Sequence, residues 1–252
     1  MRNRILYIFM IPFFLMIFVF RCGESIEDPD PPERPLWVEK SAPTDTIESG
    51  IRPYNDDNGI LLEWHPNLEE DISGYKLYRT SKDIENKFAL IADINAFKIS
   101  GADTFFIDDL VQLNTDYFYY LKAYDQAENK SDPSDTIRYR LIEKAEPLKP
   151  LGTINNHTPE FEWYDFTNVT YEYVIRVESF SPREVVWISR IIRRDYTGFF
   201  LEISYNSDGS AILNSLESET MYQWCIKSIS LVDNRNFDIG GSISNWGYFT
   251  IE

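Results

Sequence analysis

Apolar and polar side chains alternate over short stretches along most of this chain. In residues 117–123 the alternation places one set of mostly apolar side chains on a single face, and residues 222–228 repeat the pattern. Because successive side chains of a β-strand point to opposite faces, a period of two predicts strands with one buried face. The expected buried sets are Tyr117, Tyr119, Leu121 and Ala123 in the first strand and Tyr222, Trp224, Ile226 and Ser228 in the second.

The alternating runs are separated by segments rich in Asp, Asn, Gly, Ser and Pro. These residues favour turns, and no stretch after residue 35 has the period of an amphipathic helix. The chain also repeats itself, because the run that ends at Trp64 has a counterpart that ends at Trp163, 99 residues later. Many short strands in two repeats of this length predict two β-sandwich or barrel domains.

The first unit resembles a fibronectin type III domain over most of its length. Trp64 stands where that family has its second strand, and residues 71–79 (DISGYKLYR) lead into the third. Thr115-x-Tyr117 then opens the sixth strand, which ends at residues 123–125 (AYD).

The second unit resembles the same family less completely. It keeps Trp163, the pair Thr220-x-Tyr222 and a closing run at residues 246–251, whereas residues 179–212 depart from the family pattern. The resemblance implies an all-β fold with two tandem immunoglobulin-like β-sandwiches. The expected domains span residues 36–144 and 145–252, joined by a short, proline-containing linker.

Four aromatic residues are expected to be structural: Trp64, Tyr117, Trp163 and Tyr222. In a sandwich of this kind a tyrosine corner bonds its hydroxyl back to the backbone near the crossover between sheets. The two tyrosines hold that position here. Leu110 and Leu216 precede them by seven and six residues, and both are expected to fill the core just before the corner.

The N-terminus differs from the rest of the chain. Arg2 and Arg4 precede an apolar run at residues 5–20, and Cys22 follows. The run is short for a membrane span, and residues 1–21 resemble a bacterial lipoprotein signal that would leave lipid on Cys22. The residues also allow an uncleaved N-terminal anchor or a buried hydrophobic helix. The lipoprotein signal and the uncleaved anchor both place the domains outside the cytoplasm, anchored to a membrane of the cell envelope.

Residues 22–35 are rich in Pro, Asp and Glu and nearly free of large apolar side chains. Such a composition does not bury enough surface to offset the entropy of ordering, and proline keeps it extended. We expect this segment to be a flexible tether that holds the domains away from the membrane.

The charge and the motifs exclude several classes of protein. With 41 acidic and 24 basic residues the formal net charge is −17, which disfavours nucleic-acid binding. Nucleophile-elbow, zinc-protease and phosphate-loop motifs are absent from the sequence, so we expect no catalysis, metal or cofactor. Acidic pairs such as Asp108-Asp109 are expected in solvated loops, and Cys225 is expected to face outward or to be partly buried.

Aromatic residues on the outward parity of two neighbouring strands form the candidate binding patch: Tyr78, Phe118, Tyr120 and Tyr124. Aromatic rings provide a large contact area at a low entropic cost. The second domain could instead cover these rings. The predicted function is a non-catalytic binding or spacer module that docks an envelope protein or a glycan. The alternative is a polysaccharide-binding accessory protein that uses the same aromatics.

Overall fold

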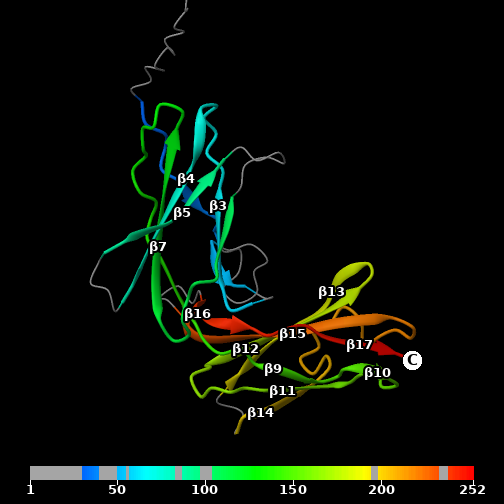
Figure 1. Ribbon diagram of the computed structural model, residues 1–252. Helices are drawn as coiled ribbons and strands as arrows, with labels where there is room; N and C mark the ends of the chain where they lie inside the picture. Colours follow the sequence, from blue (N-terminus) through cyan, green and yellow to red (C-terminus); the bar gives the residue numbers. More distant parts are fainter. Residues whose placement is uncertain are drawn as a thin grey trace, which may run out of the picture.

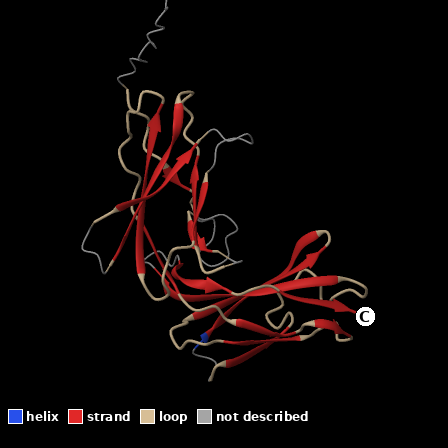
Figure 2. Ribbon diagram, viewed as in Figure 1, coloured by secondary structure: helices blue, strands red, loops and turns tan. Residues whose placement is uncertain are grey.

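The computed structural model describes residues 30–39, 50–54, 57–82, 87–96, 104–193, 198–232 and 238–252. Within these ranges the chain folds into 17 β-strands, and its helical structure is limited to a short 3-10 segment at Arg193, drawn in blue in Figure 2. The predicted signal and Cys22 lie outside the described residues. Among the described residues, no helix has the length and apolar character that a membrane span requires. The predicted all-β fold with two immunoglobulin-like sandwiches is confirmed.

The first sandwich packs two antiparallel sheets against each other (Figure 1). In one sheet β3 is central, and its partners are β1 and β2 at one side and β6 at the other. The strands of this sheet are β1 (Leu36–Trp37), β2 (Ile51–Pro53), β3 (Ile60–His65) and β6 (Phe105–Asp108). The other sheet has the order β8 (Ile137–Leu141), β7 (Asp116–Asp125), β4 (Ile72–Ser81) and β5 (Ala89–Asn95).

The second sandwich repeats this plan. Its smaller sheet has the order β14 (Phe200–Ser204), β11 (Glu160–Tyr164) and β9 (Glu146–Lys149). Its larger sheet contains β13 (Arg183–Ile192), β12 (Glu172–Phe180) and β15 (Met221–Val232), and β15 then pairs with both β16 (Asp238–Ile243) and β17 (Gly247–Ile251). The short β10 (Gly152–Ile154) joins the edge of β17 in parallel.

Each sandwich has its own hydrophobic core, and the two cores are built alike. The Trp64 ring packs edge-on against Tyr75 with 5.4 Å between ring centroids, and Trp163 packs against Tyr173 at the same distance. Both tryptophans are almost completely buried. The alternating residues of β7 and β15 that the pattern assigned to the interior are also buried. Burial of such large rings provides much of the drive for folding.

Both tyrosine hydroxyls make a bond to the backbone five residues upstream. The amide of Gln112 donates to the Tyr117 hydroxyl, and the amide of Glu217 donates to the Tyr222 hydroxyl, each at 2.9 Å. These bonds fasten the crossover between the sheets of each sandwich.

One of the two leucines that were predicted to fill the cores is exposed instead. Leu216 is 1% exposed and packs in the second core, but Leu110 is 78% exposed. The first core instead receives Val111, which stands six residues before Tyr117 as Leu216 stands six before Tyr222. The expectation for Leu110 failed because it followed residue type, whereas the distance from the tyrosine corner decides which side chain points inward.

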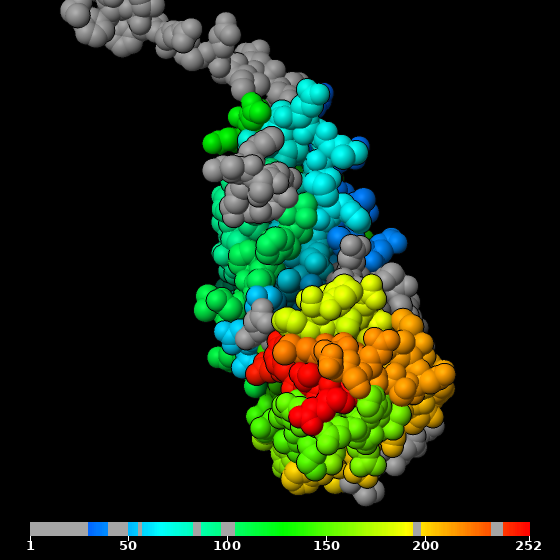
Figure 3. Space-filling model, turned by 90° about the vertical axis from the view of Figure 1, so that its right-hand side faces the viewer, coloured from blue at the N-terminus to red at the C-terminus, as the bar shows by residue number. Residues whose placement is uncertain are grey.

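A backbone joint links the two sandwiches, which form an L in Figure 1 and touch in the space-filling view of Figure 3. β16 pairs in parallel with β8, with Gly241 opposite Leu141. The amide of Ile142 donates to the Gly241 carbonyl at 3.1 Å, and the Ser242 hydroxyl donates to the Glu143 carbonyl at 3.0 Å. This pairing joins the larger sheets of both sandwiches into one sheet of 10 strands.

The end of the predicted tether packs against the first sandwich. Pro32 and Pro35 are buried, the Glu33 amide donates to the Glu69 carboxylate at 2.7 Å, and Arg34 pairs with Asp135. Ordered packing therefore begins before residue 36, because two prolines and two polar contacts suffice to dock this acidic segment.

Candidate functional site

The four residues of the first-sandwich patch, Tyr78, Phe118, Tyr120 and Tyr124, lie on the outer face of β4 and β7. The register places Tyr78 directly opposite Tyr120, and side chains two residues apart on β7 share this face. All four side chains are half-buried. The described contacts between the sandwiches involve β2, β8 and β16, whereas the patch lies on β4 and β7.

Neighbouring aromatic rings hold the centre of the patch in place. Tyr78 and Tyr120 stack with 4.8 Å between centroids and an interplanar angle of 16°, and Phe88 leans on Tyr120 at 4.8 Å. Burial raises the pKa of Tyr120, and the nearby Tyr78 adds to this rise. Tyr120 is therefore neutral at physiological pH, and the stacked pair presents an apolar surface with phenolic hydroxyls.

Cationic side chains flank both ends of the patch. Arg138 lies over the Phe118 ring at 5.9 Å, and Lys76 lies over Tyr124 at 4.6 Å. Lys76 also pairs with Asp93, which accepts a bond from the Tyr124 hydroxyl. Such contacts fix the orientation of the outer rings, because a cation is attracted to the electron-rich face of an aromatic ring.

Asp116 holds the arginine side chains at the Phe118 end of the patch. Its carboxylate is almost fully buried and pairs with both Arg138 and Arg140. Burial acts to raise the pKa of Asp116, but the hydrogen bonds from Arg140 and Arg138 outweigh it and hold the pKa below its usual range. The charge is thus retained at neutral pH, and Arg138 is held over Phe118.

Asp108 is a buried structural residue rather than part of a solvated loop. Its carboxylate is 3% exposed and accepts bonds from Arg79 at 2.8 Å and from the Tyr119 hydroxyl at 2.9 Å. Asp165 takes a similar place in the second sandwich, with Tyr173 and Arg193 as its partners. The expectation for Asp108 failed because its partners Arg79 and Tyr119 are distant in sequence, and a local sequence pattern does not predict such contacts.

Cys225 lies on the outer face of β15 and outside the core cluster, as its parity predicted, but it is 5% exposed and therefore buried rather than partly buried. The register puts Arg176 opposite Cys225, and Arg176 reaches along β12 to Glu178 at 2.6 Å. Arg183 and Gln223 also bind that carboxylate. Long polar side chains therefore converge over this face and shield the thiol from solvent.

A second aromatic cluster, which the sequence reasoning missed, lies at the end of the smaller sheet of the second sandwich. It consists of Tyr164, Phe166, Phe199 and Phe200, which we call the second-sandwich patch. The Tyr164 ring contacts the other three, at centroid distances of 4.7, 6.0 and 4.8 Å. The signal was present in the parity of Tyr164 with Glu162 and in the Phe199-Phe200 pair, but that pair falls where the family pattern fails.

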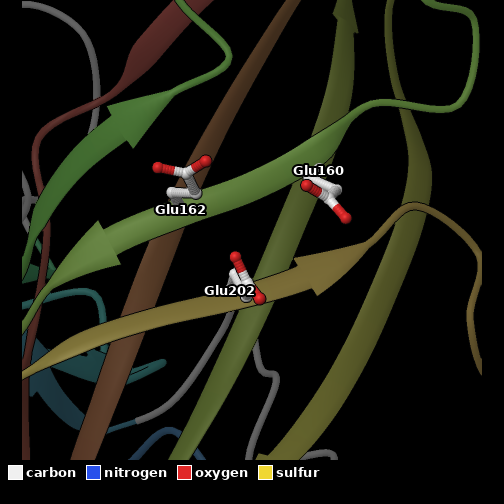
Figure 4. Close-up of side chains that lie close together, drawn as sticks. All are labelled: Glu160, Glu162 and Glu202. Carbon is white, nitrogen blue, oxygen red and sulfur yellow. The ribbon is translucent and has the colours of Figure 1, made fainter. Parts of the chain in front are cut away.

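Three glutamates lie beside this patch on the same sheet. Figure 4 shows the side chains of Glu160 and Glu162 on β11 and of Glu202 on β14. One carboxylate oxygen from each of the three lies within 4.8 Å of the other two. The side chains are exposed or half-buried, so solvent screens them, and the grouping by itself does not define a metal site.

Of the two histidines, one makes a structural contact and the other is exposed. The Nδ1 atom of His157 donates a hydrogen bond to the Leu216 carbonyl at 2.6 Å, and His65 is exposed at the end of β3. A shallow hollow on the first sandwich is lined by the docked tether and by Lys130 and Asp132.

No protein-family model and no curated protein matches the chain. Solved structures match it at low similarity. The FN1–FN3 domains of chicken CNTN1 share 14% identity over 88% of this chain and 68% of that one, with a TM-score of 0.34. A two-domain fibronectin type III segment of chicken tenascin shares 15% identity over 86% and 99% of the two chains, with a TM-score of 0.28.

A β-1,2-glucanase from Parabacteroides distasonis matches at 20% identity and a TM-score of 0.32, over 46% of this chain and 14% of that one. At these values the matches carry no argument about what this chain binds. The fold described above is established by the strand pairing of the chain itself.

Proposed function

We propose that this chain is a non-catalytic, lipid-anchored protein of the bacterial cell envelope, which binds a partner through the first-sandwich patch. The observation that carries the proposal is the ordered aromatic face of β4 and β7. Tyr78 and Tyr120 are already stacked, so little side-chain entropy is lost when a partner docks on them. Buried aromatic anchors of this kind dominate the affinity of many protein interfaces.

The joint between the sandwiches supports a role as a spacer. The hydrogen bonds of Gly241 and Ser242 hold the second sandwich at a set orientation to the first. A lipid on Cys22 and an acidic segment before residue 30 would keep both sandwiches beyond the membrane surface. Nothing in this arrangement needs a catalytic group.

The test uses isolated bacterial envelope and the full-length protein in detergent. Binding of solubilised envelope to the immobilised protein is compared for the wild type and for the double variant Phe118→Ala/Tyr120→Ala. We expect the double variant to lose most of the captured material. Tyr248→Ala serves as the control, because Tyr248 is a 47% exposed tyrosine on the second sandwich. Equal capture by the double variant would exclude the patch.

A polysaccharide is the alternative partner, since sugar faces also stack on aromatic rings. A glycan array probed with the same three proteins separates the two ideas. Binding to a glycan that disappears in Phe118→Ala/Tyr120→Ala assigns the patch to a sugar. Capture of envelope protein without any array signal assigns it to a protein.

The anchor is tested separately by the intact mass of the native protein extracted from membranes. A chain that begins at Cys22 and carries lipid supports the proposal. A chain that begins at Met1 would replace the lipid anchor by an uncleaved N-terminal segment.

A further inference from the structure

The second-sandwich patch is the more exposed of the two aromatic surfaces. Phe200 is 72% exposed, Phe166 47% and Phe199 45%, and all three contact Tyr164. Large apolar side chains scattered singly over a surface are ordinary, but a contiguous exposed cluster marks an interaction site. In Figure 1 the sheet of β9, β11 and β14 is the layer farthest from the first sandwich.

The carboxylates of the smaller sheet lie directly beside these rings. In the register of β11 and β14, Tyr164 stands opposite Phe200 and Glu162 stands opposite Glu202. Positions two residues apart on a strand share a face and are about 7 Å apart. A single extended ligand therefore reaches both the rings and the glutamates.

The charged side chains beside the patch are mostly negative. Lys149 pairs with Glu162 at 2.9 Å, whereas Glu160 and Glu202 make no ion pair with any other described residue. Like charges placed across neighbouring strands destabilise a sheet. A cationic ligand relieves this repulsion, whereas a neutral sugar leaves it unchanged.

The other aromatic rings of this protein already show how such a cation would sit. Described Arg and Lys side chains lie over Tyr117, Phe118, Tyr124, Tyr173 and Trp246. In the described part of the chain no such cation lies over Tyr164, Phe166, Phe199 or Phe200. Phe166, Phe199 and Phe200 combine an exposed ring with nearby negative charge, as a cation–π site requires.

We infer that the second-sandwich patch docks a segment of a partner polypeptide rich in arginine or lysine. One guanidinium group stacks on Phe200 or Tyr164 and makes paired hydrogen bonds to Glu202, and a second basic side chain of the same segment pairs with Glu160. The site is separate from the first-sandwich patch, so it stands or falls independently of the function proposed above.

The experiment measures the affinity of fluorescein-labelled hexa-arginine for the full-length protein in detergent by fluorescence anisotropy. Phe200→Ala and Phe166→Ala leave the net charge unchanged, and we expect each to weaken binding about ten-fold. Glu202→Gln removes one carboxylate, and we expect a loss of several-fold that shrinks at high salt. Both phenylalanines are exposed, so the thermal transition should stay within about 2 °C of the wild type.

Phe180→Ala is the matched control, because Phe180 is 49% exposed and lies on β12 in the larger sheet of the same sandwich. Unchanged affinity in Phe180→Ala together with the loss in Phe200→Ala assigns binding to the patch. Equal affinity for hexa-arginine in all these proteins would overturn the inference, because the net charge alone would then explain the binding. A neutral hexasaccharide that binds in a Phe200-dependent way while hexa-arginine does not would overturn it as well.

Discussion

The backbone amide of Ile142 donates a hydrogen bond to the carbonyl oxygen of Gly241, and this 3.1 Å contact joins the two sandwiches. A Cβ atom at position 241 would lie 2.2 Å from the carbonyl oxygen of Ser228 and 3.3 Å from the Tyr139 hydroxyl. Real side chains do not come so close to a backbone oxygen. The joint therefore depends on the absence of a side chain at this position.

Gly241→Val is expected to break this joint. The added side chain must displace β16 from β15 or from β8, so the two sandwiches should move independently. Small-angle X-ray scattering should then show a larger radius of gyration and a less structured scattering curve. Gly59→Ala is the control, because its nearest clash is a movable methyl group of Ile107 at 3.3 Å. An unchanged curve for Gly241→Val would show that the joint does not depend on this pairing.

The two leucines before the tyrosine corners should respond very differently to truncation. Leu216→Ala removes a fully buried side chain, and we expect it to lower the free energy of unfolding by about 2–5 kcal/mol. Leu110→Ala should change it by less than about 0.5 kcal/mol, because Leu110 is exposed. Val111→Ala should fall between the two. Urea unfolding monitored by tryptophan fluorescence tests the series, and comparable losses for Leu110 and Leu216 would contradict the assignment of the core.

The outcome at Leu110 shows which part of the fold is readable from sequence. Alternation over residues 117–123 identifies the buried face correctly, because the period of two is a property of the strand alone. The loop before the strand has no such period. Its inward side chain is set by the position of the tyrosine hydroxyl, whose backbone donor lies five positions upstream.

Tyr222→Phe isolates the contribution of a corner hydroxyl. The variant keeps the ring but leaves the amide of Glu217 without its acceptor. We expect the free energy of unfolding to fall by about 0.5–1.5 kcal/mol, since a partly buried donor loses its partner. Tyr248→Phe, in which an exposed tyrosine loses its hydroxyl, should leave stability within experimental error. A silent Tyr222→Phe would mean that water replaces the hydroxyl at no cost.

Glu178 should make the free energy of unfolding depend on pH. Burial acts to raise the pKa of Glu178, but hydrogen bonds from Arg176, Arg183 and Gln223 outweigh it and hold the pKa below its usual range. A carboxyl group whose pKa falls on folding stabilises the native state above its unfolded pKa, near 4.3 for Glu. That stabilisation is lost as the pH falls from there through the folded pKa.

Glu178→Gln therefore should destabilise the protein most at neutral pH. We expect a loss of about 1–3 kcal/mol at pH 7, which shrinks as the pH approaches 3. The control is Glu184→Gln, an exposed position on β13. Chemical unfolding at a series of pH values gives the comparison, and a difference between wild type and Glu178→Gln that does not change with pH would refute the role of this carboxylate.

The sequence analysis predicted neither the Glu178 cluster nor the second-sandwich patch. The partners of Glu178 come from β12, β13 and β15, and its pairing with Gln223 spans 45 residues. Two rings of the second-sandwich patch, Phe199 and Phe200, lie within residues 179–212, where the family pattern is lost. A local pattern predicts the face of one strand, whereas a site made by several strands depends on a register that only the folded chain reveals.

The most direct test of the proposed binding function places a photoreactive amino acid on the first-sandwich patch in living cells. p-Benzoylphenylalanine replaces Tyr120 in one strain and Tyr248 in another, and the cells are irradiated. The account predicts a discrete adduct of higher mass for position 120 and none for position 248. No adduct at position 120, or the same adducts at both positions, would contradict it.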